Sequence, residues 1–175
     1  MIETPRLVLR PLTPDDAAYL SERFGGAAAR RLEGAPQARR AFGLRAVVGR
    51  REEALLGCCG LWRQPDVAGR DEVEIWGALL PAYRGCGCAT EAVRACRDEA
   101  FDRIGLERLI ALIDPADVAA RRVAEKVGMR LEREVAHGGR RRGLYVVRRG
   151  EGRGRPHGPR PVVAAPCYVA FRLTR

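Results

Sequence analysis

The sequence predicts an α/β fold in which helices flank a mixed sheet. After residue 72, strand-like and helix-like segments alternate, an order that is typical of folds with parallel neighbouring strands. Before that point, apolar runs on either side of a short charged turn indicate a pair of neighbouring strands. The chain has 175 residues, which is long enough to bury its own core, and we predict a single domain over residues 1–175.

The first third of the chain is predicted to hold a strand and a helix. Residues 6–10 alternate apolar and charged positions, as a half-buried strand does. Thr13 is a suitable N-cap, Pro14 fits a first helical turn, and two acidic residues follow that suit the helix dipole. We therefore expect a helix up to about Phe24, followed by a short helix or loop over 27–41.

The middle of the chain is predicted to hold three strands and a long helix. Strands over 43–50 and 54–63 flank a charged turn, and a third strand spans 72–80. Small and apolar residues then recur at helical spacing over about 87–104, and Gly105 ends this helix.

The last third begins with an apolar strand over 107–113, followed by a helix that starts at Pro115 and ends at Gly128. Three strand-like runs follow, over 130–136, 144–148 and 168–173. We expect one long, interrupted strand up to Arg148 that pairs with the C-terminal run. Residues 149–161 are rich in Gly, Arg and Pro and predict a flexible loop, although such a run also suits RNA binding.

The segment between the third strand and the long helix has the composition of an anion-binding loop. Gly85, Gly87 and Ala89 let backbone N–H groups approach a ligand closely, and they lie where a helix N-terminus favours negative charge. The guanidinium of Arg84 suits phosphate oxygens. A Gly-rich turn that binds nothing is the alternative. We predict a pyrophosphate cradle formed by Arg84, Gly85, Cys86, Gly87, Cys88, Ala89 and Thr90.

The loop lacks the Gly-Lys-Ser/Thr ending of a P-loop and the third glycine of a dinucleotide fingerprint. Its Arg-Gly-x-Gly-x-Ala pattern resembles the acetyl-coenzyme A loop of the GNAT acetyltransferases. Residues 3–12 resemble the opening of the branch that acetylates the N-termini of ribosomal proteins, and residues 123–129 resemble the closing helix motif of that branch. The resemblance covers residues 1 to about 135.

This resemblance implies a mostly antiparallel central sheet with one splayed strand pair, and acetyl-CoA as co-substrate without a metal. It implies that the backbone groups of Leu79 and Leu80 pair with pantetheine. It also places Asp117 where the family has an asparagine that bonds the donor, and Ala120 where the family has a serine. A carboxylate there would repel phosphates unless Arg121 or Arg122 neutralises it.

Acetyl transfer to an amine needs a base, and Glu74 is the predicted one because it lies within the third strand, near the expected splay. Glu72 is a substitute on the same face, and a cross-strand ion pair is the alternative role of Glu74. Many relatives supply the acid from a tyrosine at the position of Ala124. Tyr145 is the predicted substitute here, with Tyr168 as a second candidate.

The composition limits the cellular compartment and the kinds of ligand to expect, but it does not identify a partner. The formal net charge is +10, which favours polyanions such as coenzyme A, ribosomal RNA or acidic peptides. The six cysteines contain no Cys-x-x-Cys pair, so we predict reduced thiols in a cytoplasmic protein and no metal site. No apolar run approaches the ~20 residues of a membrane span. A helix N-terminus should lower the pKa of a thiol at Cys86 or Cys88, although both also serve as small side chains.

The sequence predicts a cytoplasmic N-acetyltransferase that acts on a primary amine, either a protein N-terminus or a small amine, through a direct ternary complex. One alternative is a coenzyme A-binding domain without catalysis, which the changes at Asp117 and Ala120 favour. Another is a basic protein associated with RNA or the ribosome. A homodimer is also compatible with the sequence.

Overall fold

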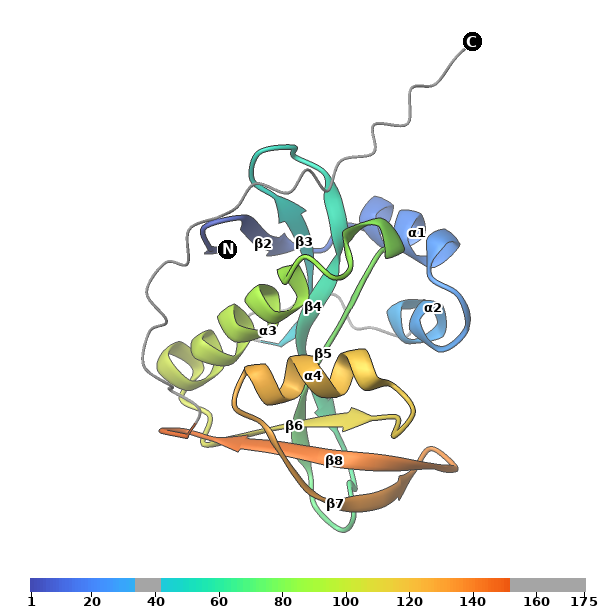
Figure 1. Cartoon of the computed structure of the whole chain (residues 1–175), viewed down its shortest axis with the longest axis vertical. Coiled ribbons are helices and arrows are strands. Elements are labelled where there is room, and N and C mark those ends of the chain that lie inside the picture. The colour runs from blue at the N-terminus through green and yellow to red at the C-terminus, as the bar shows by residue number, and fades with distance from the viewer. Residues whose placement is uncertain (34–41, 152–175) are drawn as a thin grey trace.

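The computed structural model describes residues 1–33 and 42–151 and forms one eight-stranded sheet with the order β1-β2-β3-β4-β5-β6-β8-β7. Within these residues, β5 and β6 are the only parallel neighbours, so the prediction of a mixed, mostly antiparallel α/β sheet is confirmed (Figure 1). The strands are β1 (Ile2–Glu3), β2 (Leu7–Pro11), β3 (Gly43–Gly49), β4 (Leu55–Gln64), β5 (Glu72–Leu79), β6 (Arg108–Ile113), β7 (Arg130–His137) and β8 (Arg140–Arg148).

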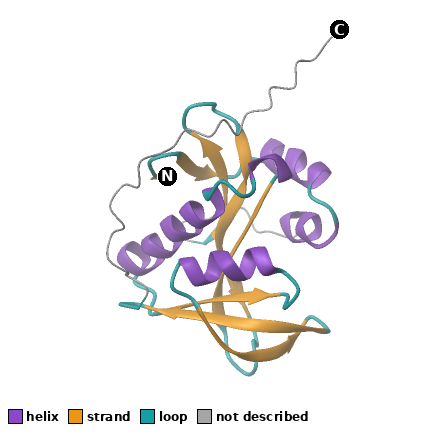
Figure 2. Cartoon of the chain, viewed as in Figure 1, coloured by secondary structure: helices purple, strands orange, loops and turns teal. Residues whose placement is uncertain are grey.

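Two pairs of helices cover the two faces of the sheet (Figures 1 and 2). Cys59 packs in the cluster beneath α3 and α4, whereas its neighbour Cys58 packs with α1 and α2. Since successive strand residues point to opposite faces, these helix pairs lie on opposite sides. The helical segments are α1 (Pro14–Arg23), α2 (Gly26–Glu33), the 3₁₀ turn η1 (Pro81–Tyr83), α3 (Cys88–Glu99), the π-helical turn η2 (Ala100–Ile104) and α4 (Val118–Lys126).

The start of α1 confirms the predicted N-cap. The Thr13 hydroxyl accepts from the Asp16 N–H at 3.1 Å, and the Asp16 carboxylate accepts from the Thr13 N–H at 2.9 Å, which completes a capping box. Arg10 of β2 also donates to Asp16, with Nη2 2.9 Å from Oδ1. This carboxylate therefore fixes the helix against the strand that precedes it.

The predicted layout of the C-terminal strands is wrong. Residues 130–137 and 140–148 form two separate strands, β7 and β8, that pair antiparallel as a hairpin. The turn consists of Gly138 and Gly139, whose φ angles are 57° and 71°; this left-handed pair reverses the chain tightly. β8 then pairs with β6 along its length. The strand predicted over 168–173, and the predicted loop from residue 152 on, lie outside the described residues.

We predict that Asp16→Asn removes part of the acid sensitivity of the fold. Hydrogen bonds from Arg10 lower the pKa of Asp16 to about 2, whereas the unfolded chain has the usual value. This contribution to the free energy of unfolding is full above about pH 4 and is lost as the pH falls toward 2. It amounts to about 2 kcal/mol at neutral pH. Urea unfolding of both proteins between about pH 6 and 3 measures the difference. Parallel stability curves would contradict the assignment.

Candidate functional site

The sheet opens between its only two parallel strands among the described residues. β5 and β6 share a single register pair, Glu74 with Ile110, whereas β4 and β5 pair along their full length. The first residues of the two strands are held together, because Arg108 Nε lies 3.0 Å from Glu72 Oε1. The strands therefore diverge toward their C-terminal ends, and the predicted splayed strand pair is confirmed (Figure 1).

Leu79 presents its backbone to this opening, whereas Leu80 does not. The Leu80 N–H donates to the Leu56 carbonyl at 2.9 Å, so it is not available to a ligand. Backbone groups of successive residues point to opposite sides of a strand, which turns those of Leu79 away from β4 and toward β6. The Leu79 carbonyl accepts from Arg84 Nε, so its N–H is the group left for a ligand. Of the two predicted backbone contacts, only Leu79 fits the opening.

The predicted anion-binding loop leads from η1 into α3. Gly85 and Gly87 have left-handed φ angles of 80° and 84°, which side chains rarely adopt. Gly87 is the N-cap of α3 and makes no side-chain capping bond, so the first-turn N–H groups are left to a ligand. Open space surrounds Gly85, where an added Cβ would meet no atom within 4 Å. The loop thus has the shape and the dipole of a cradle for phosphate.

Arg84 lies at the edge of this cradle and also fixes the loop to β5. Its Nε donates to the Leu79 carbonyl at 2.9 Å, which ties the loop to the end of β5. The side chain belongs to an exposed residue, so its other guanidinium nitrogens face solvent at the loop. Arg84 therefore links the two parts of the predicted donor site, the loop and the strand opening.

A carboxylate that we did not predict fastens the loop to the N-terminal strands. Glu91, in the first turn of α3, accepts from the Thr4 hydroxyl at 2.7 Å and from Arg6 Nε at 2.7 Å. Arg6 Nη1 donates in turn to the Cys86 carbonyl at 2.9 Å. Burial alone would raise the pKa of Glu91, but the hydrogen bonds from Thr4 and Arg6 outweigh it and lower the pKa. The signal for these residues was the Thr4-Pro5-Arg6 motif, which sequence reasoning used only as a family resemblance.

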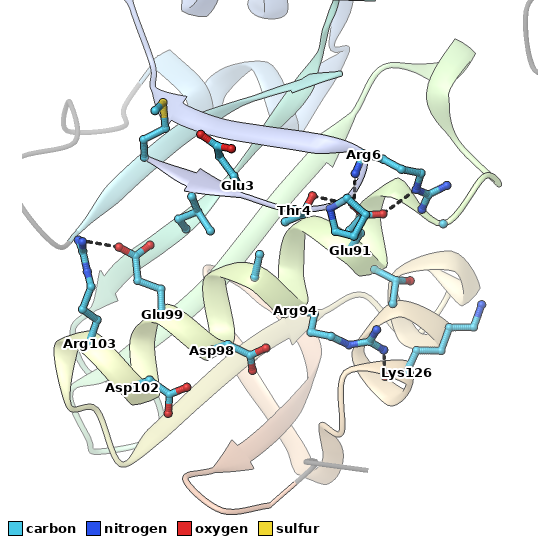
Figure 3. A pocket seen from close by; sticks show the side chains of 16 residues that line it. Glu3, Thr4, Arg6, Glu91, Arg94, Asp98, Glu99, Asp102, Arg103 and Lys126 are labelled. Atoms are coloured by element: carbon cyan, nitrogen blue, oxygen red, sulfur yellow. Dashed lines mark hydrogen bonds and ion pairs between the residues drawn. The ribbon is translucent and has the colours of Figure 1, made fainter. Parts of the chain in front are cut away.

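A groove of about 900 Å³ runs along α3 from this carboxylate to η2 (Figure 3). It reaches Gly87 and Thr90 but includes no residue of β5 or β6, so it is separate from the opening in the sheet. Arg94 and Lys126 line it near the loop, and the Arg94 guanidinium donates to the Lys126 carbonyl at 3.2 Å. This bond joins the middle of α3 to the end of α4.

The two loop thiols lie next to each other. Cys86 Sγ is 3.2 Å from Cys88 Sγ and 3.1 Å from the Tyr83 carbonyl oxygen. Burial raises the pKa of the Cys88 thiol to about 12, and its hydrogen bond with Cys86 adds to the effect. The expectation that the helix N-terminus lowers a thiol pKa is therefore wrong for Cys88, because loss of water outweighs the dipole.

Asp117 has a structural partner of its own. Its Oδ1 accepts from the Ala120 N–H at 2.9 Å, so the carboxylate caps α4, and the helix begins at Val118 instead of Pro115. The neighbouring Arg121 points to a different group: its Nε lies 3.2 Å from the Tyr145 hydroxyl. The contact of Asp117 with a donor stays a prediction.

The two predicted catalytic side chains lie on opposite faces of the sheet. Tyr145, 4% exposed, packs in the cluster beneath α3 and α4. Glu74, 1% exposed, shares its face with Ile110, which packs in a different cluster, and accepts from Gln64 Nε2 at 2.6 Å. Ile110 and Ala111 are the β6 residues paired with Glu74 and Tyr145, so the two groups flank β6 at its paired end.

Comparison with known proteins agrees with this geometry. Residues 6–130 match the family described as "Acetyltransferase (GNAT) domain". The chain belongs to the GNAT family. The uncharacterized protein YkkB of Bacillus subtilis strain 168 is 36% identical over 86 residues, which are 49% of this chain and 49% of that protein. The chain thus spans about half the length of the curated relatives it matches.

Solved structures show the same GNAT fold at lower identity. A putative GnaT-family acetyltransferase from Bordetella pertussis superposes with a TM-score of 0.69 at 23% identity, over 83% of this chain and 97% of that one. A putative ribosomal-protein-serine acetyltransferase from Vibrio cholerae has a TM-score of 0.62 at 19% identity, over 84% of this chain and 96% of that one.

The described part of this GNAT domain contains neither a metal cluster nor a membrane-spanning helix. Within residues 1–33 and 42–151, no three His, Cys, Asp or Glu side chains are placed to hold a metal ion. In the same part of the chain, no helix is long and apolar enough to cross a membrane.

We predict that Glu91→Gln loosens the loop of this GNAT domain while the rest of the fold persists. The amide would keep the shape of the side chain but lose the ion pair with Arg6. Amide hydrogen exchange over residues 84–90 should accelerate relative to the strands of the sheet. Glu99→Gln is the matched control, since Glu99 lies on the same helix and pairs with Arg45 and Arg103. Equal effects of both changes on the loop would contradict the role of Glu91.

Proposed function

We propose that this protein transfers an acetyl group from acetyl-CoA to a primary amine within a direct ternary complex. The observation that carries the proposal is the opening between β5 and β6. It has an anion-binding helix N-terminus at its wide end, and Glu74 and Tyr145 on opposite faces at its paired end. Family membership supports the same reaction.

In this proposal, the donor binds to groups of the loop before α3 and of the end of β5. The loop and the first turn of α3 hold the pyrophosphate through backbone N–H groups, and Arg84 adds charge. The backbone of Leu79 pairs with the pantetheine arm. When bound, acetyl-CoA supplies an activated thioester, and a backbone N–H near Leu79 would stabilise the oxyanion. Asp117, which caps α4, borders the same donor site.

Proton transfer uses one side chain on each face. Glu74 takes the proton of the attacking amine, directly or through water, on the face opposite α3 and α4. Tyr145 returns a proton to the departing thiolate on the other face. Arg121 orients that step, because its donation to the Tyr145 oxygen leaves the hydroxyl hydrogen free to point elsewhere. Tyr145 thus takes the place of the tyrosine that α4 lacks at Ala124.

The acceptor we propose is the N-terminal amine of a protein, as in the branch that acetylates ribosomal proteins. The opening motif supports this, since its Thr4 and Arg6 are built into the site through Glu91. The fold shared with the Vibrio cholerae ribosomal-protein-serine acetyltransferase is compatible with it. The domain proposed for the reaction comprises residues 1–175.

Acetyl-CoA binding is the first prediction of this proposal. Titration calorimetry should show micromolar binding by the wild type, weaker binding by Arg84→Ala and none by Gly87→Glu. A glutamate at Gly87 would place negative charge in the cradle, where it repels phosphate, at a φ of 84° that side chains rarely adopt.

Gly69→Glu is the matched control for Gly87→Glu. Gly69 also has a left-handed φ, 85°, with open space around it, but it lies in the turn between β4 and β5. The Gly69→Glu variant should bind acetyl-CoA as the wild type does. Failure of the wild type to bind would overturn the proposal, and tight binding without turnover of any amine tested would favour a non-catalytic sensor.

Loss of turnover in the two catalytic variants is the second prediction. Glu74→Gln should lower kcat by about a hundredfold or more at neutral pH, with little change in the KM for acetyl-CoA. Tyr145→Phe should also lower kcat, because the departing thiolate then lacks its proton donor. The amines tested as acceptors should include peptide N-termini, polyamines and aminoglycosides.

Glu72→Gln is the control for Glu74→Gln, because Glu72 lies two residues away on the same face and pairs with Arg108. Glu72→Gln should lower stability and leave kcat close to that of the wild type. An unaltered kcat in Glu74→Gln would remove Glu74 from the role of base.

A further inference from the structure

Two thiols lie together inside the loop that we propose to bind the donor. Cys86 and Cys88 are separated only by Gly87, and both side chains lie on the same side of the loop, with their sulfurs 3.2 Å apart. Cys86 is partly exposed, whereas Cys88 is buried at 8% exposure. The pair therefore has one sulfur that a solute can reach and a second sulfur directly behind it.

We propose that Cys86 and Cys88 form an oxidation site that reacts with a low-molecular-weight disulfide, such as glutathione disulfide, and that the resulting Cys86–Cys88 bond blocks the loop. The first half of this inference stands on the thiol pair itself. The second half rests on the proposed binding of acetyl-CoA.

The reaction balances as two thiol–disulfide exchanges. The Cys86 thiol loses its proton and attacks one sulfur of glutathione disulfide, which forms a mixed disulfide and releases one glutathione. Cys88 then loses its proton, attacks the Cys86 sulfur and releases the second glutathione. Two protein thiols are oxidised, and one small disulfide is reduced to two thiols.

The order of the two steps follows from the surroundings of the thiols. The raised pKa of Cys88 makes it a poor first nucleophile, and its burial keeps a bulky disulfide away. Cys86 is therefore the point of entry. The second step takes place within the loop across 3.2 Å, where the effective concentration of Cys88 is high.

Bond formation changes the part of the loop that a ligand would contact. The sulfurs must close by about 1.2 Å to reach the bond length of about 2.05 Å. The ring that forms contains Gly87, which caps α3, and Cys88, the first residue of that helix. Closing this ring therefore displaces the N–H groups of the first turn.

The chain contains a second thiol pair that serves as an internal control. Cys59 of β4 and Cys96 of α3 are hydrogen-bonded to each other, and each is only 2% exposed. A small disulfide cannot reach this pair in the folded protein. Proximity of thiols is therefore common to both pairs, and access distinguishes them.

The test uses the full chain treated with excess glutathione disulfide. Intact mass and peptide mapping should show loss of two hydrogens and a Cys86–Cys88 bond, and dithiothreitol should reverse it. Acetyl-CoA binding, measured by calorimetry, should be lost on oxidation and return on reduction. Cys96→Ala should behave as the wild type does.

Two variants separate the steps. Cys88→Ala should stop at the mixed disulfide on Cys86. Cys86→Ser should stay reduced at Cys88, and its acetyl-CoA affinity should be the same before and after addition of the oxidant. A thermal unfolding curve of each confirms that it is folded.

The outcomes are distinct for the two proposals. No bond, or a bond from Cys86 to another cysteine such as Cys167, would overturn the redox site whether or not acetyl-CoA binds. A Cys86–Cys88 bond with unchanged binding would overturn the block. A reduced wild type that fails to bind acetyl-CoA would overturn the proposed function, while the mass readout would still decide whether the thiol pair reacts.

Discussion

The parallel pairing of β5 with β6 is the constraint on which the rest of this structure depends. Parallel neighbours need a crossover connection, and here the crossover is the loop, α3 and η2. The crossover must start where β5 ends, which brings the N-terminus of α3 beside the wide end of the opening. Because the strands pair only at Glu74 and Ile110, one topological choice supplies both the opening and the anion-binding helix next to it.

Several charged side chains at family positions make contacts that stabilise the fold. Glu91 connects α3 to the N-terminal strands, Asp117 caps α4, and Arg84 holds the end of β5. Each of these groups has a protein partner, and two of them, Arg84 and Glu91, also lie at the loop that we propose to bind the donor. A residue type at a family position therefore does not by itself decide between binding and structural roles, and only its partners do.

Local patterns predicted most of the fold and the position of the loop. The strands over 43–50, 54–63 and 72–80 and the cap at Thr13 needed only neighbouring residues to be recognised. The Gly138-Gly139 turn is also a local pattern, but the prediction instead treats residues up to Arg148 as one interrupted strand that pairs with the C-terminal run.

The partners of Glu91 are 85 and 87 residues away in the chain, so no local pattern could reveal them. The separation of Glu74 and Tyr145 onto opposite faces depends on the register of three strands, which sequence alone did not provide.

The placement of Glu74 and Tyr145 on opposite faces affects the routes by which the proposed substrates reach the site. An amine that reaches Glu74 and a donor that is held at the loop before α3 would approach from different sides of the sheet. The layer of α1 and α2 forms one wall, and the layer of α3 and α4 forms the other. Under the proposed function, changes to the first layer would alter which amine is admitted, and the loop proposed to bind coenzyme A would stay the same.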